Sequence, residues 1–420
     1  MDNVKLVIHR GSHEIGGSCV EIFSPQTRIL LDVGLPLSDE KVSLSSELKN
    51  VDAVLISHPH PDHFGLLDEI ADDIPVYTGE LTEKFIQATR IFQGQEPLSN
   101  SFRHFESWKS LSIGDFEITP FLMDHSAADA YSFLIEGAGK RIFYSGDLRA
   151  HGRKSKLFDQ MIKDPVKDVD VLLLEGTMIG RGNHDFPDER AVEKKMIEVL
   201  KNESGPVFLL SSSQNIDRIV SAYRAAIQTG RIFVVDIYTA WILRELYNTS
   251  KTKATPDLSW DKIRVLSKGG TAGLHYEKLK SNPEYFGNFA REIYDKQNVI
   301  TEDELAAQAG KYFIKNNYTE RLIEKVKAPH AAVIYSMWEG YLTPEHNPHG
   351  FQRMERLKNN PNIDFVSIHT SGHATVADLQ NFAKAINPER LIPIHTEHAD
   401  EYDEYFANVT AVKDKEKIQL

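Results

Sequence analysis

Residues 55–67 read LISHPHPDHFGLL and crowd three histidines and one aspartate into the six positions from His58 to His63. His58 and His60 each precede a proline, which favours extended backbone. In an extended chain residues i and i+2 project from the same side, so these two histidines can hold one metal ion. Asp62 and His63 fall where helix-like spacing begins and can face a second ion. A solvated histidine-rich turn is the competing interpretation, but the spacing, the prolines and the strand-to-helix context together favour a two-metal site.

Composition limits the chemistry of such a site. The 420-residue sequence contains one cysteine, Cys19, so an intrachain disulfide and a thiolate cluster are excluded, and histidine and carboxylate must hold any metal. A net charge of −13 argues against broad coating of nucleic acid, although a local basic channel is compatible with it. The sequence contains no run typical of a signal peptide or a membrane span. It therefore predicts a cytoplasmic protein that has no membrane partner.

Strand-like segments dominate both ends of the chain. They occur at residues 4–8, 18–23, 28–34, 51–57, 116–122, 131–136, 140–145 and 169–174, and strand signals return at 363–368 and 391–394. After about residue 185 helix-like and strand-like segments alternate, as in a parallel α/β unit. The tail thus resembles the head, and the middle is predicted to form a second domain.

Further candidate ligands stand at the ends of predicted strands. They are His125 in MDHSA, Asp147 in YSGDLRA and His395 in IPIHTEH. Each is a weak signal alone, because a lone histidine is more often a core or surface residue than a ligand. With the residues of HPHPDH they make five histidines and two aspartates. This set suits zinc, with manganese or iron as alternatives.

The HPHPDH stretch resembles the signature of the metallo-β-lactamase superfamily, in which Asp32 of LLDVG precedes it and His125 and Asp147 follow it. The resemblance implies an α/β fold, the αββα sandwich of that superfamily. It also implies two metal sites, one formed by His58, His60 and His125 and the other by Asp62, His63 and His395, with Asp147 bridging them. Asp32 would either steady the ligand loop from outside the metal shell or simply cap a turn.

Three later motifs resemble the β-CASP branch of that superfamily, and ribonuclease J most of all. They contain Glu175 in LLLEGT, His373 in HTSGHAT and His395 in IPIHTEH. In that branch an α/β β-CASP domain is inserted into the metallo-β-lactamase domain. The resemblance therefore implies a metallo-β-lactamase domain formed by residues 1–187 and 349–420, with a β-CASP domain at residues 188–348.

The resemblance implies a dinuclear metal-dependent ribonuclease that hydrolyses single-stranded RNA with two Zn²⁺ ions, or with Mn²⁺. The catalytic residues would be Asp62 at the metals, His373 to stabilise developing charge or protonate the leaving oxygen, and Glu175 to orient His373. A histidine at position 373 accompanies RNA-acting members of the branch, whereas DNA-acting members tend to carry valine. The residues leave open whether the enzyme acts as a 5′-exonuclease or an endonuclease.

Candidate substrate contacts flank these motifs. Ser371 and Gly372 precede His373 and can cup a phosphate, and His13 in GSHEIGG belongs to a loop that lies close to the active site in the family. The loop Ser211, Ser212 and Ser213 offers an anion site at a predicted helix N-terminus and in ribonuclease J faces the RNA 5′ end. Ordinary helix capping is an equally good interpretation of both serine-containing loops.

Two features depart from the ribonuclease J pattern. The chain ends shortly after His395, where that family usually carries a further domain, which indicates a short form with a homodimer as one option. The third motif reads His395-Thr396-Glu397, whereas His-Gly-Glu is common in the family. Three alternatives remain: a metallohydrolase that acts on a thioester or lactone, a DNA-acting β-CASP nuclease, and a regulatory partner with little activity.

Overall fold

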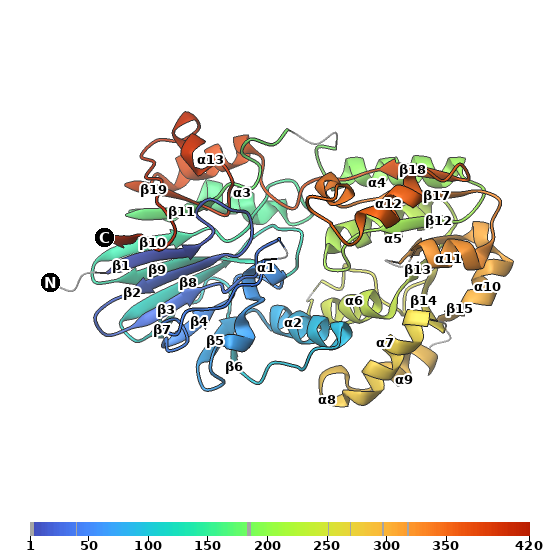
Figure 1. Cartoon of the computed structure of the whole chain (residues 1–420), viewed down its shortest axis with the longest axis horizontal. Helices are drawn as coiled ribbons and strands as arrows, with labels where there is room; N and C mark the ends of the chain where they lie inside the picture. The colour runs from blue at the N-terminus through green and yellow to red at the C-terminus, as the bar shows by residue number, and fades with distance from the viewer. Residues whose placement is uncertain are drawn as a thin grey trace. The chain divides into compact units, whose positions relative to one another are not determined.

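The computed structural model describes residues 4–38, 40–182, 186–250, 252–268, 270–295, 298–316 and 319–420. The chain divides into two compact units (Figure 1). Unit 1 comprises residues 1–87, 96–183 and 372–420, and unit 2 comprises residues 88–95 and 184–371. Both ends of the chain therefore build one unit, and the middle builds the other.

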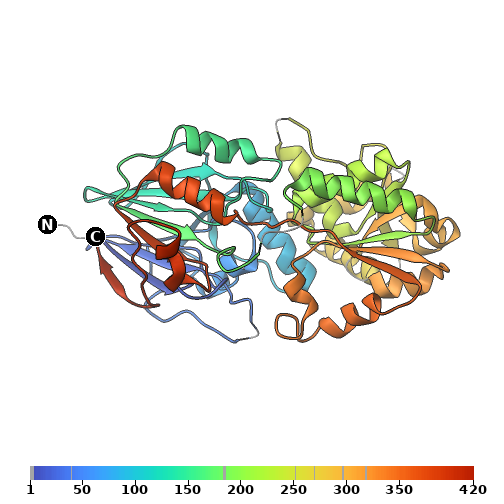
Figure 2. The same cartoon turned by 90° about the horizontal axis from the view of Figure 1, so that it is seen from above.

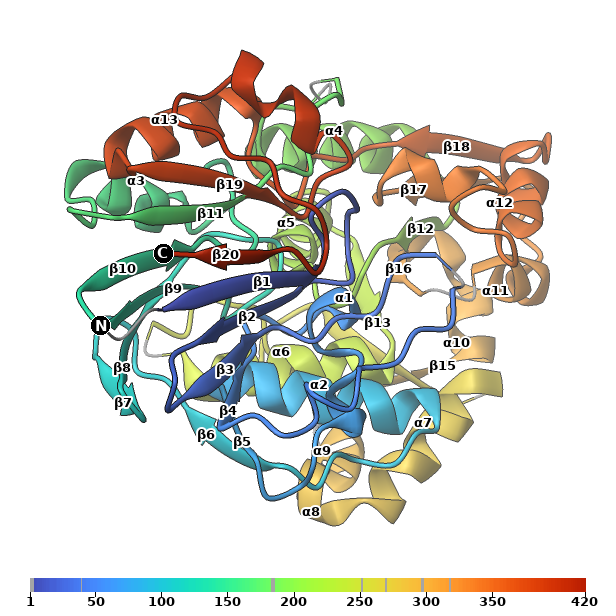
Figure 3. The same ribbon diagram turned by 60° about the vertical axis from the view of Figure 1, so that its left-hand side comes forward.

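Unit 1 contains two β-sheets. In order across the first sheet, the strands are β20 (Lys417–Gln419), β1 (Lys5–Arg10), β2 (Cys19–Phe23), β3 (Arg28–Leu31), β4 (Ala53–Leu55), β5 (Pro75–Thr78) and β6 (Ser101–His104). The second has β19 (Arg390–Ile394), β11 (Val171–Glu175), β10 (Lys140–Tyr144), β9 (Tyr131–Gly137), β8 (Phe116–Leu122) and β7 (Leu111–Ile113). Figure 3 shows β20 beside β1, with which it pairs antiparallel. The first and last strands of the chain therefore share a sheet.

Apolar side chains from the two sheets form the core between them. Leu31 and Leu55 of the first sheet belong to the same buried cluster as Phe133 and Ile142 of the second. Alternate strand residues point to opposite faces, so Val54 contributes to a separate cluster on the outer face of the first sheet. Strands that are buried on both faces need nearly continuous apolar sequence, which explains the runs RILL and AVL.

Helices cover the outer faces of the sandwich. Helix α1 (Pro61–Phe64), the short 3-10 helix η1 (Leu67–Glu69) and α2 (Glu80–Gln93) contribute to the cluster on the first sheet. Helices α3 (Ser155–Lys163) and α13 (Val376–Ile386) lie on the second sheet (Figure 1). Phe158 of α3 and Phe382 of α13 pack with Leu172 and Leu391. The η4 helix (Ala399–Glu404) also lies on this side through Tyr402. Unit 1 is therefore an αββα sandwich, and the predicted fold class is confirmed.

Unit 2 is built on a seven-stranded, all-parallel sheet. Its order is β15 (Val299–Thr301), β14 (Ile263–Lys268), β13 (Ile232–Val235), β16 (Tyr312–Lys315), β12 (Val207–Leu210), β17 (Ala331–Tyr335) and β18 (Ile363–Ser367). Helices flank both faces of this sheet (Figure 2). On one face lie α4 (Glu189–Asn202), α5 (Ile216–Gln228), α6 (Ile237–Thr249), α7 (Gly270–Ser281), α8 (Pro283–Phe286) and α9 (Phe289–Asp295). On the other lie α10 (Glu302–Ala307), α11 (Thr319–Val326) and α12 (Phe351–Lys358), with the 3-10 helices η2 (Ala309–Lys311) and η3 (Glu339–Leu342) nearby in sequence.

The second boundary between the units differs from the prediction. We predicted that the chain returns to the first domain at residue 349, but the structure places the return at Gly372. The reason is that β18 pairs in parallel with β17 and completes the sheet of unit 2. The sequence pattern of residues 363–368 identifies a strand but carries no information about its partner. No described helix combines the length and the apolar character that crossing a bilayer requires.

Candidate metal centre

The HPHPDH residues follow β4 and lead directly into α1. His60 immediately precedes the helix with φ −84° and ψ 141°, the extended conformation that the following proline favours. Pro61 takes the first helical position, where its missing N–H costs no hydrogen bond. Asp62 and His63 lie in the single turn of α1, and His63 is buried. The strand, loop and helix therefore follow one another as the sequence indicates.

Side chains from five separate segments of unit 1 meet at this loop. In each of four triads the atoms that could bind a metal lie within 4.8 Å of one another. The triads are His58, His60 and His125; His58, His63 and Asp147; Asp62, His63 and His395; and His125, Asp147 and His373. The structure thus brings together all seven residues predicted as ligands, and His373 joins them.

Strand ends deliver the more distant members of the cluster. Asp147 follows β10, and His395 follows β19 directly, with its backbone in the left-handed region at φ +51°. β10, β11 and β19 run parallel, so their carboxyl ends share one edge of the sheet. Nδ1 of His395 lies 2.9 Å from Oγ of Ser18, and its Nε2 lies 3.8 Å from Oδ2 of Asp62. Ser18 therefore fixes the ring with Nε2 toward the cluster.

Asp32 is fully buried and holds the ligand loop through several hydrogen bonds. Its Oδ1 accepts the backbone N–H of Ser57 at 2.7 Å, and its Oδ2 accepts the hydroxyls of Ser57 at 2.8 Å and Tyr144 at 2.7 Å. Oδ2 also lies 2.7 Å from Nδ1 of His63. A proton on Nδ1 toward this carboxylate leaves the lone pair of Nε2 directed at the cluster. Asp32 therefore contacts the ligand loop directly, beyond any capping of its own turn.

The electrostatics of the cluster depend on burial. Burial lowers the pKa of His58 and His125 well below the usual range, and that of His60 to about 4, so these rings are neutral. For Asp147 burial opposes ionisation, but neighbouring histidines hold its pKa well below the usual range. His63 differs, because Asp147 and Asp32 outweigh burial and raise its pKa well above its usual value. A positive charge is thus favoured where the His63 ring lies, between the carboxylates of Asp147 and Asp32.

Unpartnered buried atoms test whether metal ions fit this cluster. Within the described residues, Nε2 of His63 and Oδ1 of Asp147 have no hydrogen-bond partner. Buried polar atoms are nearly always paired, because an unpaired one keeps its full desolvation cost. Neutral imidazoles and an ionised carboxylate are the donors that zinc and manganese prefer. The residues present therefore fit divalent metal ions.

His373 and Glu175 form a pair beside the cluster. Glu175 is the last residue of β11 and fully buried, and its carboxylate accepts the backbone N–H groups of Leu148 at 3.3 Å and Thr177 at 3.0 Å. Its Oε1 lies 3.1 Å from Nδ1 of His373. Burial disfavours protonation of His373, but Glu175 and Asp147 raise its pKa. The ring is therefore well suited to carry a proton beside the metal-binding groups.

Sequence reasoning missed several residues that support the cluster. Ser18, Ser57 and Tyr144 make the contacts described above, and each is buried. Arg149 is fully buried, and its Nε lies 3.6 Å from Oδ1 of Asp124, the residue before His125. Ser57 and Asp124 stand next to predicted ligands, which was an available signal. Tyr144 stands in the same YSGDLRA stretch as Asp147, but its partner Asp32 is 112 residues away, and Ser18 is 377 residues from His395, so no local pattern indicates these two contacts.

The predicted substrate contacts lie in different places. Gly372 belongs to unit 1, where a side chain on its Cα would approach Oγ of Ser126 to 2.9 Å. Ser371 is a buried residue of unit 2. His13 is partly exposed, with Nδ1 3.0 Å from Oγ of Ser12, and belongs to none of the four triads.

The serine loop belongs to unit 2. Ser211 and Ser213 are buried, and Ser212 is exposed and accepts the backbone N–H of Gln214 at 3.2 Å. Helix α5 is capped by Asn215, whose side chain accepts the N–H of Arg218. The capping role that was an alternative for these serines is therefore taken by the asparagine.

Comparison with known proteins agrees with this architecture. A model of the β-lactamase superfamily domain matches residues 27–201, and a model of the Zn-dependent metallo-hydrolase RNA specificity domain matches residues 362–416. The second match includes His373 and His395. A solved structure from Enterococcus faecalis V583, described as a protein of unknown function, shares the fold, with a TM-score of 0.76 at 18% identity and 100% coverage of both chains.

Curated relatives extend over almost the whole chain. "Probable RNase MJ4" of Methanocaldococcus jannaschii is 26% identical over 93% of each chain. Ribonuclease J of Mycoplasma genitalium is 21% identical over 94% of this chain and 68% of its own length, and that of Helicobacter pylori is 22% identical over 94% and 56%. The two family models and these relatives support a ribonuclease J-like protein of the metallo-β-lactamase superfamily, as the β-CASP motifs predict.

Proposed function

We propose that the protein is a dinuclear metal-dependent ribonuclease that hydrolyses phosphodiester bonds in single-stranded RNA. The observation that carries this proposal is the Glu175–His373 pair beside a buried cluster of histidines and aspartates. A metal cluster alone is compatible with many hydrolases. A protonatable histidine oriented by a buried carboxylate supplies the additional group that a phosphodiester leaving oxygen needs. The matched RNA specificity domain and the names of the relatives support RNA as the substrate.

The metal ions are assigned to the triads. One ion would be held by His58, His60 and His125, and the other by Asp62, His63 and His395, with Asp147 shared. Zinc is the proposed metal, since the donors are neutral nitrogens and carboxylate oxygens and the matched domain model is described as Zn-dependent. When bound, two such ions would lower the pKa of a water molecule and offset the negative charge of the phosphate.

The side chains around the metals take separate roles. Asp32 keeps His63 oriented, so that the ligand geometry is set before substrate arrives. Glu175 fixes the ring of His373 and favours its protonated form. His373 then stabilises charge on the phosphate or donates its proton to the departing oxygen. Asp62 contributes its carboxylate at the metals.

The finer properties of the enzyme remain part of the proposal. Ser371, Gly372, the serine loop 211–213 and His13 are candidate RNA contacts. Exonucleolytic action from the 5′ end, endonucleolytic action, a homodimeric assembly and a cytoplasmic location stay predictions from the sequence.

A cleavage assay tests the proposal. The metal-loaded protein is incubated with single-stranded RNA that carries either a 5′-monophosphate or a 5′-triphosphate and a label, with His373→Ala as the inactive control. We expect the parent protein to cleave the RNA and the His373→Ala variant to leave it intact. Single nucleotides released from the monophosphate substrate would indicate a 5′-exonuclease, and internal fragments an endonuclease. Intact RNA together with hydrolysis of DNA, a thioester or a lactone would refute it.

A further inference from the structure

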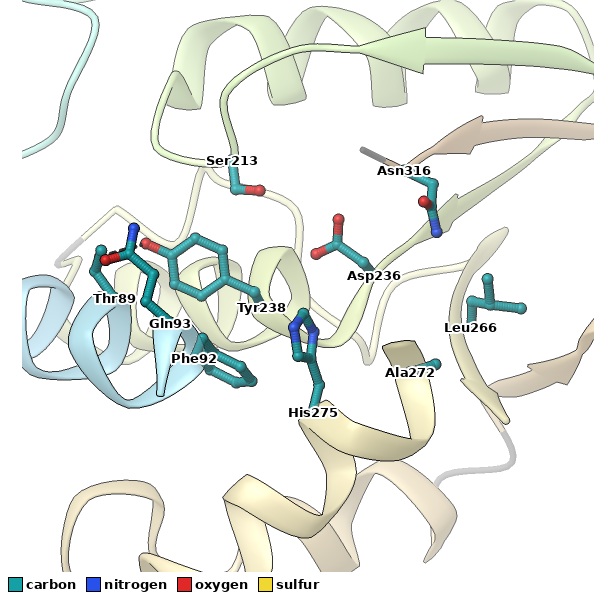
Figure 4. A pocket seen from close by; sticks show the side chains of 10 residues that line it. All are labelled: Thr89, Phe92, Gln93, Ser213, Asp236, Tyr238, Leu266, Ala272, His275 and Asn316. Carbon is teal, nitrogen blue, oxygen red and sulfur yellow. Dashed lines mark hydrogen bonds between the residues drawn. The ribbon is translucent and has the colours of Figure 1, made fainter. Parts of the chain in front are cut away.

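Unit 2 contains a cavity of about 280 Å³ whose lining includes none of the metal-cluster residues. Its walls come from loops that follow three strands of the parallel sheet, from β14 and from helices α2, α6 and α7 (Figure 4). The lining residues are Thr89, Phe92, Gln93, Ser213, Asp236, Tyr238, Leu266, Ala272, His275 and Asn316. Ser213 belongs to the serine loop that is a candidate RNA contact; the other lining residues have no predicted role in the metal centre or in cleavage.

The cavity lies where an open parallel sheet forms a binding crevice. Asp236 directly follows β13 and Asn316 directly follows β16, and these two strands are neighbours. From β13 the chain continues to β14 on one side, whereas from β16 it continues to β17 on the other side. Two helical connections that diverge in this way leave a crevice at the carboxyl ends of the strands, where ligands of such sheets bind. The topology therefore makes this cavity a candidate ligand site.

The charges in the cavity cancel. Nζ of the buried Lys315 donates to Oδ2 of Asp236 at 2.9 Å and to Oγ of Ser213. Burial opposes ionisation of Asp236, but Lys315 lowers its pKa, so the two form an ion pair. Burial also lowers the pKa of His275, which is therefore neutral near pH 7. An anionic phosphate would face the carboxylate without a free cation among the lining residues, and a metal ion would find one carboxylate that is already paired.

The remaining groups suit a planar, neutral ring. The ring of Phe92 packs against Tyr238 with centroids 5.2 Å apart and against His275 at 4.8 Å. Figure 4 shows these three side chains and the Asp236 carboxylate together around the cavity. Among the described residues nothing is hydrogen-bonded to the His275 ring, which in its neutral form offers one donor and one acceptor. Oδ1 of Asp236 already accepts the backbone N–H and the hydroxyl of Thr239, and Oδ2 accepts Lys315, so the carboxylate keeps one acceptor position, at Oδ2. The aromatic walls favour stacking.

We propose that this cavity binds a nucleobase. The base stacks among the aromatic side chains while His275 and Asp236 hydrogen-bond its edge. The bound base can belong either to a free nucleoside or to an RNA strand, and an experiment can distinguish the two. The inference goes beyond the proposed cleavage reaction, because binding of a nucleoside requires neither metal ions nor His373.

The test compares two substitutions on the same helix. Ala272→Trp fills the cavity, whereas Leu274→Trp introduces the same side chain at a neighbouring position that is 66% exposed. Titration calorimetry of the full chain with adenosine, guanosine, cytidine and uridine is run beside ribose and ribose 5-phosphate. We expect at least one nucleoside to bind with a Kd below ~1 mM. Ala272→Trp should weaken it at least 10-fold, and Leu274→Trp and His373→Ala should leave it unchanged.

A second arm identifies the source of the base. If the cavity takes a base of a strand, nucleosides bind poorly, but Ala272→Trp weakens binding of a single-stranded oligoribonucleotide at least 10-fold relative to Leu274→Trp. If Ala272→Trp misfolds by circular dichroism, His275→Leu replaces it, because it removes the donor and acceptor without adding bulk. The proposal is overturned if neither ligand responds to these variants, if ribose binds as well as the nucleosides, or if Leu274→Trp has the same effect. If the parent protein binds nucleosides but does not cleave RNA, only the proposed ribonuclease function is refuted.

Discussion

Nδ1 of His373 lies 3.1 Å from Oε1 of Glu175, although 198 residues separate the two in sequence. Glu175 ends a buried strand of the sandwich, and its carboxylate is fixed by two backbone N–H groups. His373 stands in the segment that leads into α13 and is partly exposed. A rigid buried acid therefore orients a more accessible base, which predicts that the two side chains act as one unit.

Removing either member of this pair should slow RNA cleavage more than it weakens RNA binding. We expect His373→Ala to lower kcat by roughly 10²–10⁴-fold, the usual contribution of a general acid or base. Glu175→Gln keeps the shape of the side chain, and it should cost roughly 10–100-fold because His373 loses its orientation. In single-turnover assays the double variant should be no slower than His373→Ala. If the fold-loss in rate of the double variant equalled the product of the two single-variant losses, the two residues would act independently.

Asp32 should control metal affinity rather than stability alone. Its backbone has φ +58°, a conformation that asparagine tolerates well, so Asp32→Asn changes the charge without backbone strain. We expect the variant to bind metal roughly 10–100-fold more weakly, since His63 loses its carboxylate partner. Competition with a chelating dye measures the affinity. Tyr144→Phe removes one of the other hydrogen bonds to Asp32 and should have a smaller effect; equal affinities in all three proteins would contradict this role.

Metal removal should destabilise unit 1. A ligand that binds only the folded state at 1,000 times its Kd stabilises that state by about 4 kcal/mol. A chelator should therefore lower the Tm of the metal-loaded protein, and added Zn²⁺ should restore it. His60→Ala should respond less, because it lacks one of the grouped ligands. His104→Ala, at an exposed histidine of the same unit, is the matched control and should respond like the parent protein.

The sequence predicted those parts of the site whose residues are close together along the chain. The prolines of HPHPDH predict the extended backbone at His60, and the motif spacing identified residues that the structure brings within 4.8 Å in triads. The contact between Tyr144 and Asp32 joins residues 112 positions apart, and nothing in either local pattern encodes it. The ion pair of Lys315 and Asp236 is similar, because a lysine at the end of a strand normally indicates exposure.

The fold class followed from periodicity and motif, whereas strand pairing did not. Both β18 and β19 read as short apolar strands near the end of the chain. β18 pairs in the sheet of unit 2 and β19 in the sandwich, because topology, which local sequence does not encode, selects the partner. The predicted return at residue 349 therefore precedes the observed return at residue 372.

Glu21 should make stability depend on pH in the acid range. Its carboxylate lies 2.9 Å from Nε2 of His9 and 2.7 Å from Nε of Arg28. Burial raises its pKa, but these two partners outweigh burial and lower it below the usual value. The folded state therefore binds this proton less readily than the unfolded chain. The resulting stability is complete above the ordinary glutamate pKa of about 4.3 and is lost as pH falls through the lower folded value.

We therefore expect Glu21→Gln to lose less stability than the parent between ~pH 5 and ~pH 3, in denaturant titrations at each pH. Glu117→Gln, at an exposed strand position, is the matched control and should follow the parent curve. If the free energy of unfolding of Glu21→Gln and that of the parent fell by the same amount over this pH range, the pKa of Glu21 would not change on folding and the prediction would be wrong.

Arg218 is fully buried in unit 2. Its guanidinium donates to Oε1 of Glu189 at 3.1 Å and to the backbone oxygens of Ser336 at 3.1 Å and Thr370 at 3.2 Å. One side chain thus links α4 and α5 to the end of β17 and to the segment after β18. Removing one partner of a buried ion pair leaves the other charge uncompensated, so Arg218→Met should cost about 3–5 kcal/mol.

Urea unfolding followed by tryptophan fluorescence measures this cost, because Trp241, Trp260 and Trp338 lie in unit 2 and only Trp108 lies in unit 1. The double variant Arg218→Met with Glu189→Met removes both charges and should recover a large part of the loss. If the double variant is as unstable as Arg218→Met, the hydrogen bonds to Ser336 and Thr370, rather than the ion pair, hold the segment that leads to His373.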